Sequence, residues 1–142
     1  PIATGERLCS KYEFNDILEH RAAAILQMNL ARVGGILEAK KIAAMAEGFY
    51  AEVAPHLYNG PIGAMASVQL AANIPNFLIQ ESIADFSGFH SHLLQQPIDW
   101  QAGYINVPNT AGLGISMDWQ AVSENTPYTG KALHLMMDDT HP

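Results

Sequence analysis

The sequence predicts an α/β fold in which parallel strands alternate with helices. Short apolar segments alternate with helix-forming segments over the first 82 of the 142 residues. The polar residues at which the apolar segments end recur at roughly the 25-residue spacing of one β/α unit. They are Glu6, Asn29, His56 and Glu81. Four such units would form half of an eightfold barrel, and an open four-unit sheet of the flavodoxin type is the alternative.

Two strands and one helix are expected in the first 29 residues. The strands are residues 1–5 and 23–28, which are short and apolar and end before Glu6 and Asn29. Residues 12–20 are expected to form a helix, because their apolar side chains recur on one face. A glycine pair then supplies a turn at residues 34–35.

The strongest helical signal lies in residues 36–47, which are rich in Ala, Leu, Lys, Glu and Met. Gly48 is expected to end this helix. A strand is predicted next at residues 51–55, and His56 closes it. The following helix is expected to begin at Pro61, which suits a first helical turn.

Pro75 is expected to stop that helix, because proline cannot continue one. A fourth strand is predicted at residues 77–81. After residue 82 the sequence shows little periodicity. We therefore expect residues 1–84 to form the barrel units and residues 85–142 to pack against another part of a longer chain. Within this second region, the sequence predicts a turn and short helix at residues 112–125 and a final strand at residues 131–137.

Composition excludes several functions. The formal charge is −7 with only 7 Lys and Arg residues, so no basic patch is available for nucleic acid or an anionic membrane surface. No apolar segment approaches the length of a membrane span. The lone cysteine, Cys9, cannot form an internal disulfide, which suits a reducing cytoplasm.

Polar side chains at the predicted strand ends are the candidate site, because chemistry in parallel α/β sheets collects at the carboxyl ends of the strands. Glu6 and Glu81 offer carboxylates, and His56 and Asn29 add a titratable ring and an amide. If the strands are neighbours, these four residues could supply a metal ligand, a general base and two hydrogen-bonding groups. Structural roles compete with this interpretation, since Asn29 also suits a turn.

A second, weaker candidate is the pair His90 and His92. On a strand these two side chains would share one face, as a metal site requires. No third ligand stands at a suitable spacing in the sequence.

The sequence resembles the C-terminal part of the mandelate racemase and muconate lactonizing branch of the enolase superfamily. Within that branch it is most similar to acid-sugar dehydratases of the galactonate type. The resemblance covers most of the chain, with its motifs in the right order and spacing. The motifs are IATGERL at 2–8, RVGGILEAKKIAAMAE at 32–47, VAPHLYNGPI at 53–62, PNFLIQE at 75–81 and GLGISMD at 112–118.

The resemblance implies a (β/α)7β barrel capped by an α+β domain. Residues 1–84 would be the last four β/α units of the barrel, and residues 85–142 the C-terminal contribution to the cap. The implied reaction is Mg²⁺-dependent dehydration of a sugar acid to a 2-keto-3-deoxy acid, through α-proton abstraction and an enediolate. A cytoplasmic homo-oligomer is implied for the full-length protein.

The resemblance also implies residue roles. Glu6 matches the third of three Mg²⁺ ligands, and the other two would precede Pro1. His56 matches the histidine of a His–Asp dyad, and Glu81 matches a carboxylate that stabilises the enolate-like intermediate. Asn29 stands where the dyad has its aspartate. An amide can orient the ring of His56 but adds no charge, so the choice between base and acid stays open.

Two alternatives remain at this point. A racemase or epimerase of the same branch would share the metal and His56 but keep the substrate hydroxyl. A non-catalytic α/β module that binds a small anion would use the strand-end groups for structure alone.

Overall fold

The computed structural model describes residues 1–82 and 86–125. Its centre is a parallel sheet in which β2 lies between β1 and β3. The strands are β1 (Ala3–Thr4), β2 (Ile25–Leu26) and β3 (Glu52–Val53). The predicted parallel α/β fold is therefore confirmed, although each ladder is shorter than its apolar segment.

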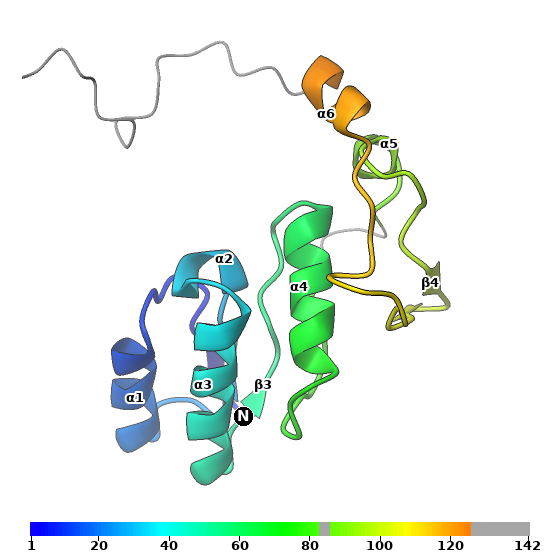
Figure 1. Ribbon diagram of the computed structural model, residues 1–142. Helices are drawn as coiled ribbons and strands as arrows, with labels where there is room; N and C mark the ends of the chain where they lie inside the picture. The colour runs from blue at the N-terminus through cyan, green and yellow to red at the C-terminus, as the bar shows by residue number, and fades with distance from the viewer. Residues whose placement is uncertain (83–85, 126–142) are drawn as a thin grey trace, which may run out of the picture.

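Helices connect the strands as the sequence predicts. The connections are α1 (Lys11–Glu19), the pair α2 (Leu30–Val33) and α3 (Ile36–Gly48), and α4 (Pro61–Ala71), which follows β3. Helix α3 packs against both α1 and α4, and Figure 1 shows these three side by side. The apolar sides of β2, α1 and α3 meet in a core that contains Phe14, Leu26 and Ile42, all with no exposed surface.

Helix α2 was not predicted. Asn29 is its N-cap, and its side-chain oxygen accepts hydrogen bonds from the backbone N–H groups of Ala31 and Arg32. The predicted glycine turn follows at once, since Gly34 and Gly35 have φ angles of +95° and +98°. These angles favour glycine and allow α3 to begin directly after α2.

The strand register brings the carboxyl ends of the three strands to one edge. Thr4 pairs with Leu26, and Leu26 pairs with Val53. Hydrogen bonds continue beyond the ladder, because the N–H of His56 donates to the Met28 carbonyl at 3.1 Å. Residues that follow the strands therefore share one end of the sheet.

The predicted fourth strand is only partly formed. Phe77 makes one parallel bridge with Val53, and the N–H of Leu78 donates to the Val53 carbonyl at 2.8 Å. Further along, the Gln80 side chain donates to the Pro55 carbonyl, a contact that replaces a backbone pair. The segment therefore runs beside β3, but within the described residues it is not a regular strand.

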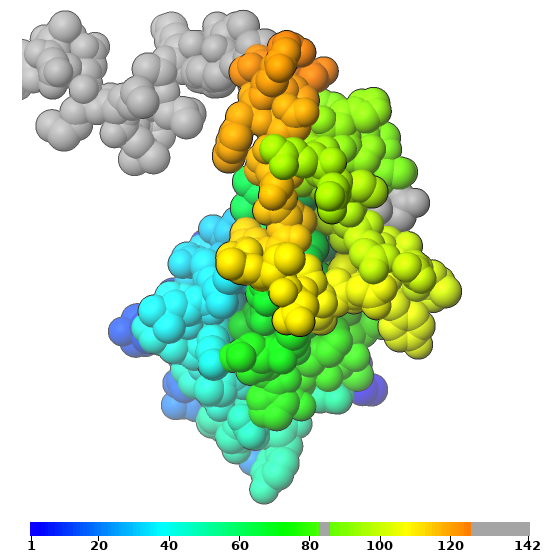
Figure 2. All heavy atoms as spheres, turned by 45° about the vertical axis from the view of Figure 1, so that its right-hand side comes forward, coloured from blue at the N-terminus to red at the C-terminus, as the bar shows by residue number. Residues whose placement is uncertain are grey.

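The C-terminal segment packs on α4. It contains α5 (Phe89–His92), β4 (Trp100–Gln101), β5 (Tyr104–Ile105) and α6 (Trp119–Asn125). A second core joins it to α4 and the preceding loop through the buried residues Leu57, Ala64, Met65, Val68, Phe86, Leu94 and Ile98. In Figure 2 the yellow and orange part of this segment lies over the green surface of α4.

Two further expectations concern this segment. The short helix predicted within residues 112–125 is present as α6. The strand predicted at residues 131–137 lies outside the described residues. None of the helices in residues 1–82 and 86–125 combines the length and hydrophobicity that a bilayer crossing needs.

Candidate functional site

The candidate site lies at the carboxyl edge of the sheet, where α2 begins and where β3 leads into α4. Asn29 is 3% exposed, and its side-chain oxygen accepts the N–H of Ala31 at 3.0 Å and that of Arg32 at 3.3 Å. These two donors fix the orientation of the amide, because only its oxygen can accept them.

The other end of the Asn29 amide faces His56. Asn29 Nδ2 lies 3.0 Å from His56 Nδ1. The ring of His56 also stacks on Tyr58, with a centroid separation of 5.5 Å and an interplanar angle of 14°. The His56 side chain is still 19% exposed.

Glu81 lies on the Nε2 side of His56. Its Oε2 is 3.9 Å from His56 Nε2, which is longer than a hydrogen bond, and accepts the backbone N–H of Leu57 at 2.8 Å. The structure thus brings together three residues that the sequence singled out, Asn29, His56 and Glu81.

Sequence reasoning missed Asn59, which lies in the loop between β3 and α4. Its amide exchanges two long hydrogen bonds with that of Asn29, at 3.3 Å and 3.4 Å. Gly63 makes room for it, because a Cβ on Gly63 would lie 2.6 Å from Asn59 Cβ. The Asn-Gly-Pro turn after His56 was the only available sequence signal.

Glu6 follows β1 by two residues and is half-buried at the same edge. Within the described residues, no hydrogen bond or ion pair joins Glu6 to Asn29, His56 or Glu81. Nor do three His, Cys, Asp or Glu side chains of that part of the chain gather as a metal cluster. A carboxylate oxygen suits Mg²⁺, so Glu6 fits one position of a ligand set that needs further oxygens from elsewhere.

The weaker sequence candidate, the pair His90 and His92, does not have the geometry expected of it. His90 and His92 lie on α5 and not on a strand, so residues two apart do not share a face. Cys9 is exposed and free.

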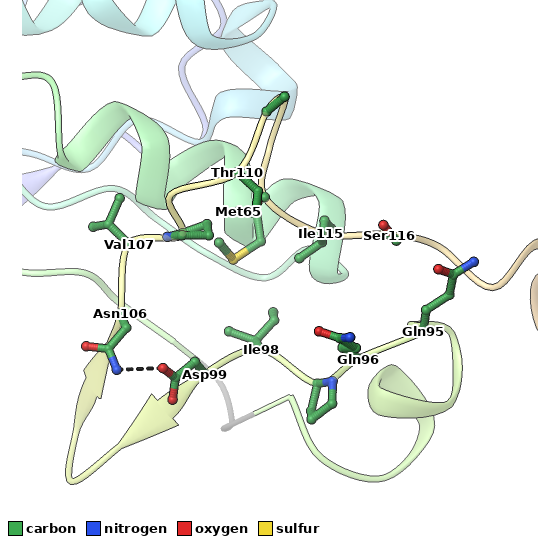
Figure 3. A pocket seen from close by; sticks show the side chains of 14 residues that line it. Met65, Gln95, Gln96, Ile98, Asp99, Asn106, Val107, Thr110, Ile115 and Ser116 are labelled. Carbon is green, nitrogen blue, oxygen red and sulfur yellow. Dashed lines mark hydrogen bonds between the residues drawn. The ribbon is translucent and has the colours of Figure 1, made fainter.

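A separate cavity of about 460 Å³ lies between α4 and the C-terminal segment (Figure 3). Met65 points into it from α4, and Asp99 lies on its rim with Asn106. Hydrogen bonds from the side chains of Asn106 and Gln101 hold the pKa of Asp99 below its usual range. None of the strand-end residues lines this cavity.

The fold and this edge define a class of protein, a parallel α/β domain with its polar groups gathered at the strand ends. Residues 1–121 match the family model described as enolase C-terminal domain-like. The chain belongs to this family.

Curated relatives carry more specific names. The D-xylonate dehydratase of Haloferax volcanii is 40% identical over 122 residues, which cover 86% of this chain and 30% of that protein. The D-galactonate dehydratase of Ralstonia nicotianae is 36% identical over 135 residues, which cover 89% and 35% of the two chains. The chain therefore spans about a third of the length of these relatives.

A solved structure from Burkholderia SAR-1, assigned to the mandelate racemase/muconate lactonizing enzymes, is similar over the whole of this chain. The TM-score is 0.87 at 60% sequence identity, and the match covers 35% of that protein. The resemblance expected from the sequence motifs is thus confirmed at the level of family and fold.

Proposed function

We propose that these residues are the C-terminal part of a Mg²⁺-dependent sugar-acid dehydratase. On this proposal, residues 1–84 complete the barrel and residues 85–142 contribute to its cap. The observation that carries the proposal is the Asn29–His56–Glu81 arrangement at the carboxyl edge of the sheet. The names of the relatives support the reaction. By the full-length protein we mean the longer chain of which these residues would be the C-terminal part.

The reaction removes the proton α to the substrate carboxylate and then expels the β-hydroxyl as water, which leaves a 2-keto-3-deoxy acid after tautomerisation. Mg²⁺, when bound, would supply positive charge that offsets the negative charge developing on the substrate. Glu6 would be one of its ligands, together with oxygens from the preceding part of the full-length protein.

His56 and Glu81 would contact the substrate together, because His56 Nε2 lies only 3.9 Å from the Glu81 carboxylate. His56 would act on a proton at Nε2. Oε2 of Glu81 already accepts the Leu57 N–H, which leaves Oε1 to carry the proton that a hydrogen bond to a developing oxyanion requires. We further propose that the full-length protein is a cytoplasmic homo-oligomer whose ligand is a small sugar acid.

The test is an assay of the full-length protein on a panel of sugar acids that includes D-xylonate and D-galactonate. We expect a 2-keto-3-deoxy acid to form with Mg²⁺ and to be lost with a chelator. The His56→Asn variant should reduce turnover by about 100-fold or more with the fold intact, because an essential proton-handling group is gone.

The matched control is His20→Asn, since His20 caps the far end of α1. Its turnover should equal that of the unchanged protein. Loss of the α-proton without loss of the hydroxyl would instead identify a racemase or epimerase. Binding of the acid without any turnover would identify a non-catalytic module.

A further inference from the structure

The geometry around His56 points to a specific form of its ring, in an inference that rests on the proposed function. We infer that Asn29, held in place by Asn59, keeps His56 as the neutral tautomer with its proton on Nε2. His56 then donates a hydrogen bond to a substrate oxygen and is not the base that takes the α-proton. Asn29 and Asn59 are positioning residues for this donor.

The first step is the orientation of Asn29. Its Oδ1 accepts the N–H groups of Ala31 and Arg32 in the first turn of α2. The Arg32 N–H also donates to the Asn29 backbone carbonyl, so the Ala31 N–H depends most on the side-chain oxygen. Turning the amide over would point its NH₂ group at these two N–H groups, and two donors cannot pair, so Nδ2 stays on the side of His56.

The second step is the tautomer. An amide NH₂ group can only donate, so at 3.0 Å from Asn29 Nδ2 the ring atom Nδ1 of His56 must accept. In a neutral imidazole the other nitrogen then carries the proton. The proton therefore sits on Nε2, the edge that faces Glu81.

The third step is the consequence for chemistry. A protonated Nε2 has no free electron pair, so it cannot remove a proton from carbon. It can donate to an oxygen, and the 3.9 Å separation from Glu81 Oε2 leaves that donor available to a ligand. The α-proton must then pass to a base in the preceding part of the full-length protein.

Asn59 and Gly63 support this arrangement. The two hydrogen bonds between the side-chain amides of Asn59 and Asn29 help to hold the NH₂ group of Asn29 toward His56. Gly63 is the residue whose missing side chain lets Asn59 approach. Within the described residues, neither Asn59 nor Gly63 makes a hydrogen bond to His56, so both act through Asn29.

The tautomer is tested by ¹⁵N solid-state NMR of the full-length protein labelled at histidine, without substrate. The His56 signals are assigned by their loss in His56→Asn. We expect a protonated Nε2 and an unprotonated Nδ1. In Asn29→Asp, which can still cap α2, a carboxylate oxygen accepts from the ring and the proton should move to Nδ1.

The matched control is Asn15→Asp on the exposed face of α1, which should leave the His56 signals unchanged. A proton on Nδ1 in the unchanged protein would overturn the inference. So would identical His56 signals in Asn29→Asp and in the unchanged protein. Because no substrate is present, this outcome does not depend on whether the protein is a dehydratase.

The role as donor has its own test. The His56→Asn variant is incubated in D₂O with a sugar acid that the unchanged protein dehydrates, and exchange of the substrate α-hydrogen for deuterium is measured. We expect exchange of this hydrogen to persist while formation of the keto acid falls by about 100-fold or more. If the variant loses both the exchange of the α-hydrogen and the formation of keto acid, His56 is the base and this part of the inference is overturned.

Discussion

At the residue scale, the site depends on a missing methyl group at Gly63. A Cβ there would lie 2.6 Å from Asn59 Cβ and 2.9 Å from its Nδ2. Gly63→Ala should displace Asn59 and loosen the amide of Asn29, which sets the ring of His56. We expect turnover of the full-length protein to fall by about 10- to 100-fold, since small displacements of catalytic groups are costly.

The neighbouring Gly60→Ala is the control for that prediction. A Cβ on Gly60 meets nothing within 4 Å, and its φ of −70° suits any residue. Steady-state kinetics should therefore separate the two variants, while their unfolding temperatures stay close. Equal turnover in both variants would remove Asn59 from the positioning of the site.

Also at this scale, the sequence identified the strand-end residues but not how they are connected. Asn29, His56 and Glu81 could be named because each follows an apolar segment of strand length. The contact between Asn29 and Asn59 could not, because it joins residues 30 positions apart through the orientation of two amides. Such a contact depends on the register of β2 and β3, which no local pattern determines.

At the element scale, α1 begins with a capping box. Ser10 and Glu13 bond reciprocally at its first turn. The Ser10 hydroxyl, and then the backbone N–H groups of Cys9 and Ser10, lower the pKa of Glu13 below its ordinary value of 4.5. A lowered pKa in the folded state means that the ionised carboxylate stabilises the fold above that ordinary value, and that this stabilisation is lost as the pH falls.

Glu13→Gln should therefore lower the unfolding temperature of the full-length protein at pH 7, and the difference from the unchanged protein should shrink progressively as the pH falls below 4.5. Thermal unfolding followed by circular dichroism over a series of pH values measures this. Glu47→Gln, at the exposed end of α3, is the control and should not lower the unfolding temperature. A difference that persists unchanged in acid would show that the carboxylate charge does not stabilise α1.

Elements differed in how well the sequence predicted them. Helix α3 was predicted nearly to its ends, because its 13 residues are rich in strong helix formers. Helix α2 has only four residues, which is too short for a periodic signal. Its only local mark was the Asn29 cap, which has the same sequence signature as a turn.

At the scale of the whole molecule, the sheet has open sides. Within the described residues, no strand pairs with the outer side of β1, and none pairs with the side of the Phe77 segment that faces away from β3. That segment also exposes Leu78 and Ile79, which are 43% and 63% exposed. An open edge with apolar side chains is a template for pairing with another chain.

We therefore expect residues 1–142, produced alone, to self-associate and to unfold without a sharp transition. The full-length protein should unfold cooperatively, because its further strands would cover these edges. Light scattering coupled to gel filtration, over a range of concentrations, measures the association. Ile79→Lys should reduce it, since a charge on an edge opposes pairing, whereas the exposed Tyr12→Lys on α1 should not. A monomeric, cooperatively folded 142-residue chain would mean that the three-stranded sheet with its two cores is sufficient by itself.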